Sequence, residues 1–119
     1  AAAVLAPADA QLLARLDGVQ GLDPRRAHAQ MGGQAALLQR VLRHFVHTYG
    51  RTSATLDPAR AHSLRGACSA IGAVALEAAL QRYELASAAS RPPLEAPILQ
   101  ALATLVDELA QALDAPVAA

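Results

Sequence analysis

One short stretch of the sequence, residues 61–73, combines the residue types and spacing that could carry out chemistry. It reads AHSLRGACSAIGA. An imidazole is followed after three, four and seven residues by a guanidinium, a glycine and a hydroxyl, which are His62, Arg65, Gly66 and Ser69. On an α-helix residues at these steps share one side. The spacing therefore predicts a helix face that points away from the core and carries an imidazole one turn from a cation.

The chemistry that this face indicates is acceptance of a phosphoryl group. An exposed imidazole is largely neutral near neutral pH, and one of its ring nitrogens is then a nucleophile. If His62 accepted a phosphoryl group, Arg65 could bind its oxygens and Ser69 could donate a further hydrogen bond. Gly66 would leave room for the donor, which would justify a mid-helix Gly that costs about 1 kcal/mol relative to Ala. A second interpretation stays open, in which His62 is an ordinary surface histidine and Gly66 is a packing contact between helices.

The other titratable residues predict no second site. His44 and His47 are three residues apart, as two metal ligands on a helix can be, but the spacing places no third ligand beside them. We expect both, and also His28, to be solvated surface residues. The single cysteine, Cys68, cannot form an internal disulfide, and we expect it to fill a small apolar position. The sequence therefore predicts no metal and no cofactor held by this chain.

Composition restricts the fold to helices. Of 119 residues, 31 are Ala and 19 are Leu, whereas only 13 are Val, Ile or Thr. Helix-forming residues dominate and strand-forming residues are scarce. The length suits one domain with a single core. We therefore expect an all-α protein.

Charge and hydropathy exclude several functional classes. Ten Arg residues balance ten Asp and Glu residues, so no overall basic field exists to attract nucleic acid or a membrane surface. No run of about 18 strongly apolar residues could span a bilayer. No Gly-rich phosphate-binding loop of a kinase or NTPase is present. Since the chain shows neither a signal-peptide pattern nor an initiator Met, we expect a cytoplasmic domain excised from a longer polypeptide.

Aspartates mark the expected helix starts. Asp9 is expected to cap a first short helix. Asp23-Pro24 and Asp57-Pro58 each combine an N-cap acceptor with a proline at the first helical position. Two short helices and four longer ones follow from these starts and from the glycines between them.

The four longer segments carry apolar residues at steps of three and four, which is typical of amphipathic helices. In the segment that follows Gly33, the apolar stripe consists of Leu38, Val41, Leu42, Phe45, Val46 and Tyr49. In the segment that follows Gly72, the stripe consists of Leu76, Leu80, Tyr83 and Ser87. Short connections between such helices favour an antiparallel four-helix bundle, preceded by one or two short N-terminal helices. We expect a single domain over residues 8–114, a linker over residues 1–7 and a C-terminal tail over residues 115–119.

The segment around His62 resembles the phosphoacceptor motif of histidine-containing phosphotransfer (HPt) domains. The resemblance rests on HSLRG at residues 62–66, preceded by Ala61 and followed by Ile-Gly-Ala at residues 71–73. It extends over about residues 22–113, since the order of a short helix, a Gly-Gly break and a long Leu-rich helix is similar to the family's approach to its motif. By position, the resemblance implies that His62 is the phosphorylated residue.

The resemblance also implies roles for the neighbours of His62. Arg65 would contact the phosphoryl group and Gly66 would give steric access, while Ser63 and Ser69 are expected to contact the partner. Arg65 stands where the family usually has Lys, so the charge is preserved but the group is wider and planar. A second departure is Tyr83 before the glutamate that follows it, where the family commonly has Leu-Glu.

The activity implied by the resemblance is that of a phosphocarrier in a multistep two-component phosphorelay, without an ATP site of its own. Its partners would be receiver domains of response regulators or of a parent hybrid sensor histidine kinase. The receiver would supply the reacting aspartate and the Mg²⁺. We expect a bacterial cytoplasmic domain, at the cytoplasmic end of an inner-membrane sensor kinase, that is a monomer in isolation and contacts neither nucleic acid nor membrane.

Two alternatives remain open. One is a helical bundle that binds a receiver or another signalling protein without phosphotransfer, for which Arg65 in place of Lys is the sequence support. The other is the dimerisation and phosphoacceptor region of a sensor kinase, which normally has an acidic residue after its histidine and a proline a few residues later. Here Ser63 follows His62, and no proline occurs until Pro92.

Overall fold

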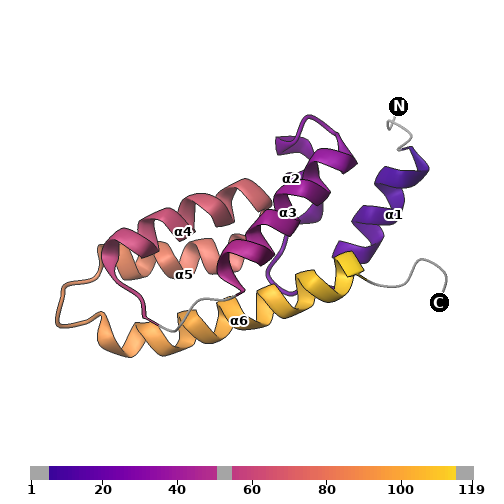
Figure 1. The fold of residues 1–119 in the computed structure, drawn as a ribbon. Helices are drawn as coiled ribbons and strands as arrows, with labels where there is room; N and C mark the ends of the chain where they lie inside the picture. Colours follow the sequence, from indigo (N-terminus) through magenta and orange to yellow (C-terminus); the bar gives the residue numbers. More distant parts are fainter. Residues whose placement is uncertain (1–5, 51–54, 115–119) are drawn as a thin grey trace.

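Six α-helices make up the part of the chain that the structure describes. The computed structural model describes residues 6–50 and 55–114, and all regular secondary structure in these residues is helical. In chain order the helices are α1 (Pro7–Leu16), α2 (Pro24–Gln30), α3 (Ala35–Tyr49), α4 (Pro58–Ile71), α5 (Val74–Leu85) and α6 (Pro92–Asp114) (Figure 1). The expected all-α class is therefore confirmed. Among the described helices, none is both long and apolar enough to cross a membrane.

The first helix begins differently from the sequence-based expectation. α1 starts at Pro7, which the sequence assigned to a linker, and its N-cap residue Ala6 makes no side-chain hydrogen bond. Asp9 therefore does not cap this helix, and the prediction that it does is wrong. Its carboxylate lies in the first turn, where it interacts favourably with the helix dipole, but it accepts its hydrogen bonds from two other helices. The rest of the expected linker, residues 1–5, and the expected tail, residues 115–119, lie outside the described residues.

The two Asp-Pro pairs start helices as predicted. The carboxylate of Asp23 accepts a hydrogen bond from the backbone N–H of Arg26 at 3.1 Å, at the start of α2. Asp57 accepts one from the backbone N–H of Arg60 at 2.8 Å, at the start of α4. Each bond satisfies a first-turn donor that has no partner within its helix. The position of every residue along α4 is thus set from a defined first turn.

A glycine ends α4 where the chain passes close to α2. Gly72 has φ 73°, and a Cβ at this position would lie 2.6 Å from the carbonyl oxygen of Asp23. The backbone N–H of Asp23 donates to the carbonyl of Gly72 at 2.8 Å. Only glycine combines the left-handed conformation with this close approach. The contact holds the start of α2 against the end of α4.

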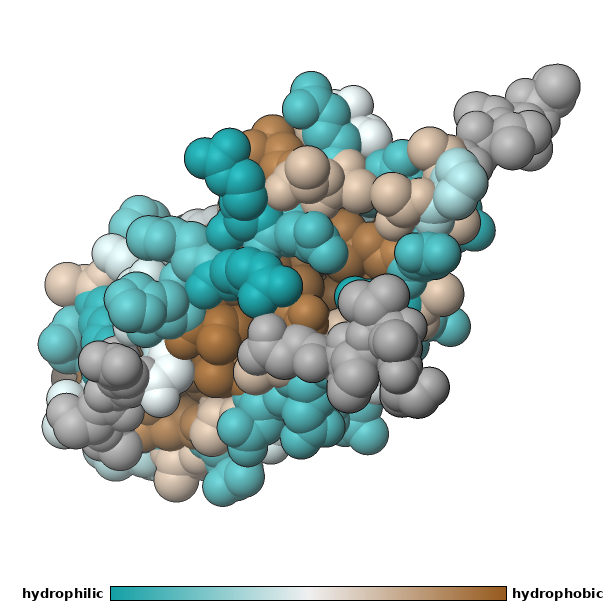
Figure 2. Space-filling view, turned by 45° about the vertical axis from the view of Figure 1, so that its right-hand side comes forward, coloured by the Kyte–Doolittle hydropathy of each residue, from teal (hydrophilic) through white to brown (hydrophobic). Residues whose placement is uncertain are grey.

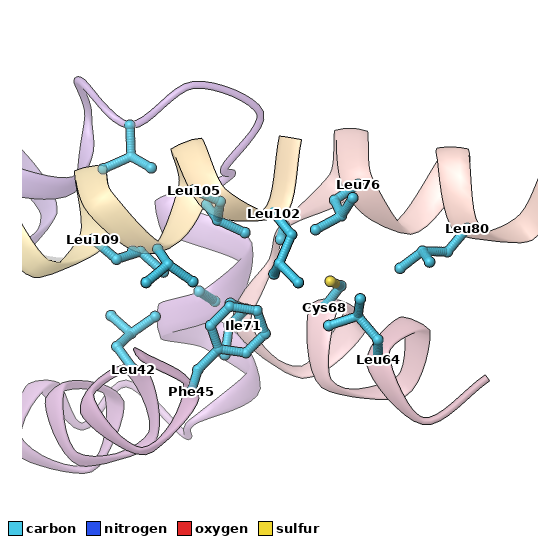
Figure 3. Packing of buried hydrophobic residues seen from close by; sticks show 14 of the residues in the cluster. Leu42, Phe45, Leu64, Cys68, Ile71, Leu76, Leu80, Leu102, Leu105 and Leu109 are labelled. Carbon is cyan, nitrogen blue, oxygen red and sulfur yellow. The ribbon is translucent and has the colours of Figure 1, made fainter. Parts of the chain in front are cut away.

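The helices pack around one apolar core. α3 and α5 each pack against both α4 and α6, while α2 packs on α3 and α4, and α1 packs on α2, α3 and α6. α4 and α5 lie side by side, and α6 runs along one side of the molecule (Figure 1). Figure 3 shows side chains from α3, α4, α5 and α6 meeting in this core, among them Leu42, Phe45, Leu64, Cys68, Leu76, Leu80, Leu105 and Leu109.

The predicted apolar stripes lie in this core with one exception. In α5, Leu76, Leu80 and Tyr83 are buried, but Ser87 is exposed because the helix has already ended at Leu85. The expectation that Ser87 continues the stripe is therefore wrong. The outer surface is more polar, and Figure 2 shows polar side chains over much of one face with apolar surface exposed between them.

Candidate functional site

His62 stands on the exposed side of α4. It lies in the second turn of the helix, and its side chain is 71 % exposed, whereas Ala61 beside it and Leu64 are fully buried. The buried pair orients the helix, so the imidazole must point outward. This is the orientation that the spacing of residues 61–73 predicts.

A carboxylate from α5 holds both the imidazole and the nearby guanidinium. One oxygen of Glu84 lies 2.8 Å from Nδ1 of His62, and the other accepts a hydrogen bond from Nε of Arg65. The hydrogen bond with His62, followed by that of Arg65, lowers the pKa of Glu84 below its ordinary value, although partial burial opposes the shift. Glu84 is therefore ionised at neutral pH and links α5 to the exposed face of α4.

This contact determines which nitrogen of His62 is available. An ionised carboxylate only accepts hydrogen bonds, so Nδ1 of His62 must carry the hydrogen. In the neutral imidazole the lone pair is then on Nε2. Within residues 6–50 and 55–114, no side chain or backbone group is hydrogen-bonded to Nε2. The site thus presents one ring nitrogen to solvent as a nucleophile, in a defined tautomer.

Arg65 is held by one of its three nitrogens. Its side chain is 34 % exposed, and its hydrogen bond to Glu84 uses Nε. Its two terminal nitrogens make no hydrogen bond to any residue that the structure describes. They are available to a ligand that approaches His62. A guanidinium in this state can bind an oxyanion with two parallel donors.

Gly66 lies on the same exposed side, and nothing surrounds it. A Cβ added to Gly66 would have no described atom within 4 Å outside its own helix. The alternative interpretation of Gly66 as a packing contact between helices is therefore wrong. Space above the glycine is open to a partner, as the steric prediction requires.

The two serines differ in their position relative to His62. Ser63 is exposed next to His62, while Ser69 is half-buried. Seven residues of helix put Ser69 about 10 Å from His62 along the axis, two turns away. The structure thus brings His62, Arg65 and Glu84 together and leaves Ser69 apart from them.

The sequence did not predict two residues of this region, Glu84 and Leu85, as site residues. It placed Glu84 only in the helix that follows the motif, and it gave no role to Leu85. Leu85 is 79 % exposed, which makes it the one large apolar side chain so exposed among the described residues. A signal for Glu84 was available: His62 lies ten residues before Gly72 and Glu84 twelve residues after it, so a helical hairpin turning at Gly72 brings the two level.

The remaining histidines fall into two groups. His44 and His47 are exposed, as expected, and His44 Nε2 lies 3.4 Å from the hydroxyl of Thr48. His28 does not fit its prediction as a solvated residue, because its side chain is only 12 % exposed and its Nε2 lies 2.9 Å from the carboxylate of Asp9. The described ranges contain no group of three His, Cys, Asp or Glu side chains that could hold a metal ion.

Cys68 has the structural role that the sequence predicts. It is fully buried, and burial raises the pKa of its thiol to about 12. A thiol with this pKa is protonated at neutral pH and is a poor nucleophile. Cys68 therefore adds no nucleophile to the candidate site.

Comparison of the chain with protein-family models, with curated proteins and with solved structures finds no match.

Proposed function

We propose that the chain is an HPt domain, which accepts a phosphoryl group on Nε2 of His62 from a receiver-domain aspartate and passes it to another receiver. The observation that carries the proposal is the contact of Glu84 with Nδ1 of His62. It leaves a solvent-facing Nε2 beside a guanidinium whose terminal nitrogens have no described partner. These are the features that phosphoryl acceptance by a histidine requires: a nucleophilic nitrogen, a nearby oxyanion binder and open access.

The helix arrangement supports the bundle that this proposal implies. α3, α4, α5 and α6 each pack against two of the other three, whereas α3 does not pack on α5 and α4 does not pack on α6. Such a cycle of neighbours is typical of a four-helix bundle, in which the diagonal pairs lie furthest apart. In this proposal α1 and α2 close one end of the bundle. The reacting histidine is then on the outer face of one bundle helix, level with the end of the next.

The proposed transfer step forms one bond and breaks one bond. The lone pair of His62 Nε2 attacks the phosphorus of the receiver's aspartyl phosphate, an N–P bond forms, and the P–O bond to the aspartate breaks. The electron pair of that bond leaves with the aspartate, which becomes a carboxylate. The imidazole keeps its hydrogen on Nδ1 and gains a positive charge, which the carboxylate of Glu84 stabilises. Transfer to the next receiver is the reverse of this step.

Arg65 can serve this step with separate nitrogens. Its Nε keeps the hydrogen bond to Glu84 while its terminal nitrogens bind the phosphoryl oxygens. A lysine would have to make both contacts from one ammonium nitrogen. The arginine is therefore consistent with phosphotransfer and does not by itself favour a domain that only binds.

The expected docking surface surrounds His62. Ser63 and Gly66 flank it on α4, and Leu85 adds an exposed apolar side chain at the end of α5. We expect a receiver, with its own Mg²⁺, to cover this surface during transfer. In this proposal the chain is a cytoplasmic domain of a hybrid sensor kinase.

A transfer assay tests the proposal. The purified chain is incubated with a phosphorylated receiver domain and Mg²⁺, and acid-labile, base-stable label is sought on the chain. We expect label on the wild-type chain and on a His28→Gln variant, and none on a His62→Gln variant. Label that persists in His62→Gln would overturn the assignment. Binding of several receivers without label on the wild-type chain would favour the alternative, a helical bundle that binds signalling proteins without phosphotransfer.

A further inference from the structure

We infer that Arg91, in the turn between α5 and α6, is a positioning residue for His62 that acts through Glu84. This inference rests on the proposed function. It concerns how the carboxylate that orients the imidazole is itself held in place.

Arg91 binds the last turn of α5. Its Nε donates to the carbonyl oxygen of Tyr83 at 3.2 Å, and its Nη2 lies 3.5 Å from the carbonyl oxygen of Glu84. The final carbonyls of a helix have no partner within the helix, and a cation at this end also interacts favourably with the helix dipole. One half-buried guanidinium therefore holds two consecutive carbonyls, one of which belongs to Glu84 itself.

The same guanidinium reaches a contact between α5 and α4. Its central carbon lies 5.6 Å from the centroid of the Tyr83 ring, which is buried. The hydroxyl of Tyr83 donates to the carbonyl oxygen of Leu56 at 3.3 Å, and Leu56 directly precedes the N-cap residue of α4. The last turn of α5 is thus tied to the first turn of the helix that carries His62.

These contacts determine where the carboxylate of Glu84 lies. Glu84 is in the penultimate position of α5, so loosening of the last turn moves its side chain relative to His62. Without Arg91 the carbonyl of Glu84 would have to be solvated, and that of Tyr83 would keep only its hydrogen bond from the backbone N–H of Ala86 at 3.2 Å. Helix ends that lose such partners fray. The hydrogen bond that fixes the tautomer of His62 would then be formed only part of the time.

The first test is ¹⁵N NMR of the His62 side chain in the unphosphorylated protein, in wild type and in an Arg91→Ala variant. Arg82 supplies the matched control, because it is an exposed cation in the same last turn of α5 and its side chain makes no hydrogen bond within the described residues. We expect wild type and Arg82→Ala to carry the hydrogen on Nδ1. In Arg91→Ala we expect the signals to shift toward the mixture of tautomers of an unconstrained imidazole.

The second readout is the phosphotransfer rate. We expect Arg91→Ala to be slower by about tenfold, less than the roughly hundredfold loss that a 1 Å misplacement of a reacting group can cause. Arg91→Lys keeps the cation but loses the two-pronged contact, so we expect a partial rescue of both rate and tautomer. If Arg91→Ala does not fold, Arg91→Lys compared with Arg82→Ala gives the same test.

A tautomer pattern in Arg91→Ala, or in Arg91→Lys if only that variant folds, identical to that of Arg82→Ala would overturn the inference. The tautomer measurement requires no phosphoryl donor, so its outcome is separate from that of the transfer assay. Suppose that the wild-type chain is never phosphorylated, but that the Arg91→Ala variant loses the Nδ1–H tautomer that wild type shows. This result would refute the proposed function and leave the inference about Arg91 intact.

Discussion

The described residues include two histidine–carboxylate pairs of nearly equal length in very different surroundings. His62 and Glu84 approach to 2.8 Å, and His28 and Asp9 approach to 2.9 Å. The side chain of His62 is 71 % exposed and that of His28 is 12 % exposed. The pairs also use different ring atoms, since Glu84 contacts Nδ1 and Asp9 contacts Nε2.

The second partner of each carboxylate completes the contrast. The same oxygen of Asp9 that contacts His28 accepts a hydrogen bond from the backbone N–H of Ala35, the first residue of α3, at 3.1 Å. Asp9 therefore joins three helices by satisfying a donor at a helix start. Glu84 instead binds the side chain of Arg65, whose terminal nitrogens make no hydrogen bond to any described residue. The two pairs have nearly the same length, so in our proposal the exposure of the histidine and the second partner of the carboxylate distinguish the reactive pair from the structural one.

The largest expected difference between the two pairs is in the transfer rate when the negative charge of each carboxylate is removed. Glu84→Gln no longer requires a hydrogen on His62 Nδ1 and releases Arg65, so we expect transfer to slow by about 10- to 100-fold, as for other residues that orient a histidine. Asp9→Asn leaves His62 untouched and should retain the wild-type rate. Rates measured with one phosphorylated receiver check both. Equal losses in the two variants would remove the functional distinction between the pairs.

Stability should show the opposite order. Asp9→Ala loses both its contact with His28 and the hydrogen bond to the start of α3, and we expect a loss of about 2 kcal/mol in the free energy of unfolding. Glu84→Ala breaks contacts at the surface, and we expect a loss of about 1 kcal/mol or less. Urea denaturation of both variants measures the difference. A larger loss for Glu84→Ala would show that the His62 pair also serves mainly to hold the fold.

The open space at Gly66 separates stability from function at a single position. Because an added Cβ meets no described atom beyond its own helix, Gly66→Ala should raise the free energy of unfolding by about 1 kcal/mol, the usual gain for this change within a helix. Transfer should nevertheless slow, because the new methyl group lies where the receiver approaches. Gly18→Ala, also with open space around it but away from His62, should transfer at the wild-type rate. Unchanged transfer in Gly66→Ala would refute the steric role.

The smallest expected effect is a dependence of the unfolding free energy on pH, caused by the titration of Glu84. Its pKa is lower in the folded chain than in the unfolded chain, because it accepts hydrogen bonds from His62 and Arg65. Its contribution to stability is therefore fully present above the unfolded-state pKa, about 4.3, and is lost as the pH falls through the folded-state value. The difference in unfolding free energy between wild type and Glu84→Gln should thus shrink only as the pH falls below about 4.3. A difference that does not shrink below this pH would contradict this assignment.

Much of the fold follows from local signals in the sequence. Asp23 and Asp57 cap helices because the acceptor and the following proline act within one turn, and Gly72 ends α4 because only glycine suits its backbone conformation. The apolar stripes identify the buried faces, because a helix repeats every 3.6 residues. The length of α5 is harder to predict, so Ser87 was included in a stripe that the helix does not reach.

Contacts between distant segments limit what the sequence can predict about the site. The exposed orientation of His62 follows from its own helix, but its partner Glu84 is 22 residues away, and the two meet only because α4 and α5 form a hairpin. Asp9 is a residue type that favours the N-cap, yet the helix already starts at Pro7 and packing places the Asp9 carboxylate against the start of another helix, 26 residues along the chain. Partners of this kind depend on tertiary packing, which the spacing of residues does not specify.

The most direct test of the central claim is to locate the bond formed by the phosphoryl group. The chain, labelled with ¹⁵N in its histidines, is phosphorylated by a receiver, and the N–P coupling is read for each ring nitrogen by NMR. We predict one phosphorylated nitrogen, Nε2 of His62, with hydrogen retained on Nδ1. Phosphorylation at Nδ1, or at any other histidine, would contradict it, because Glu84 would then not determine which nitrogen reacts.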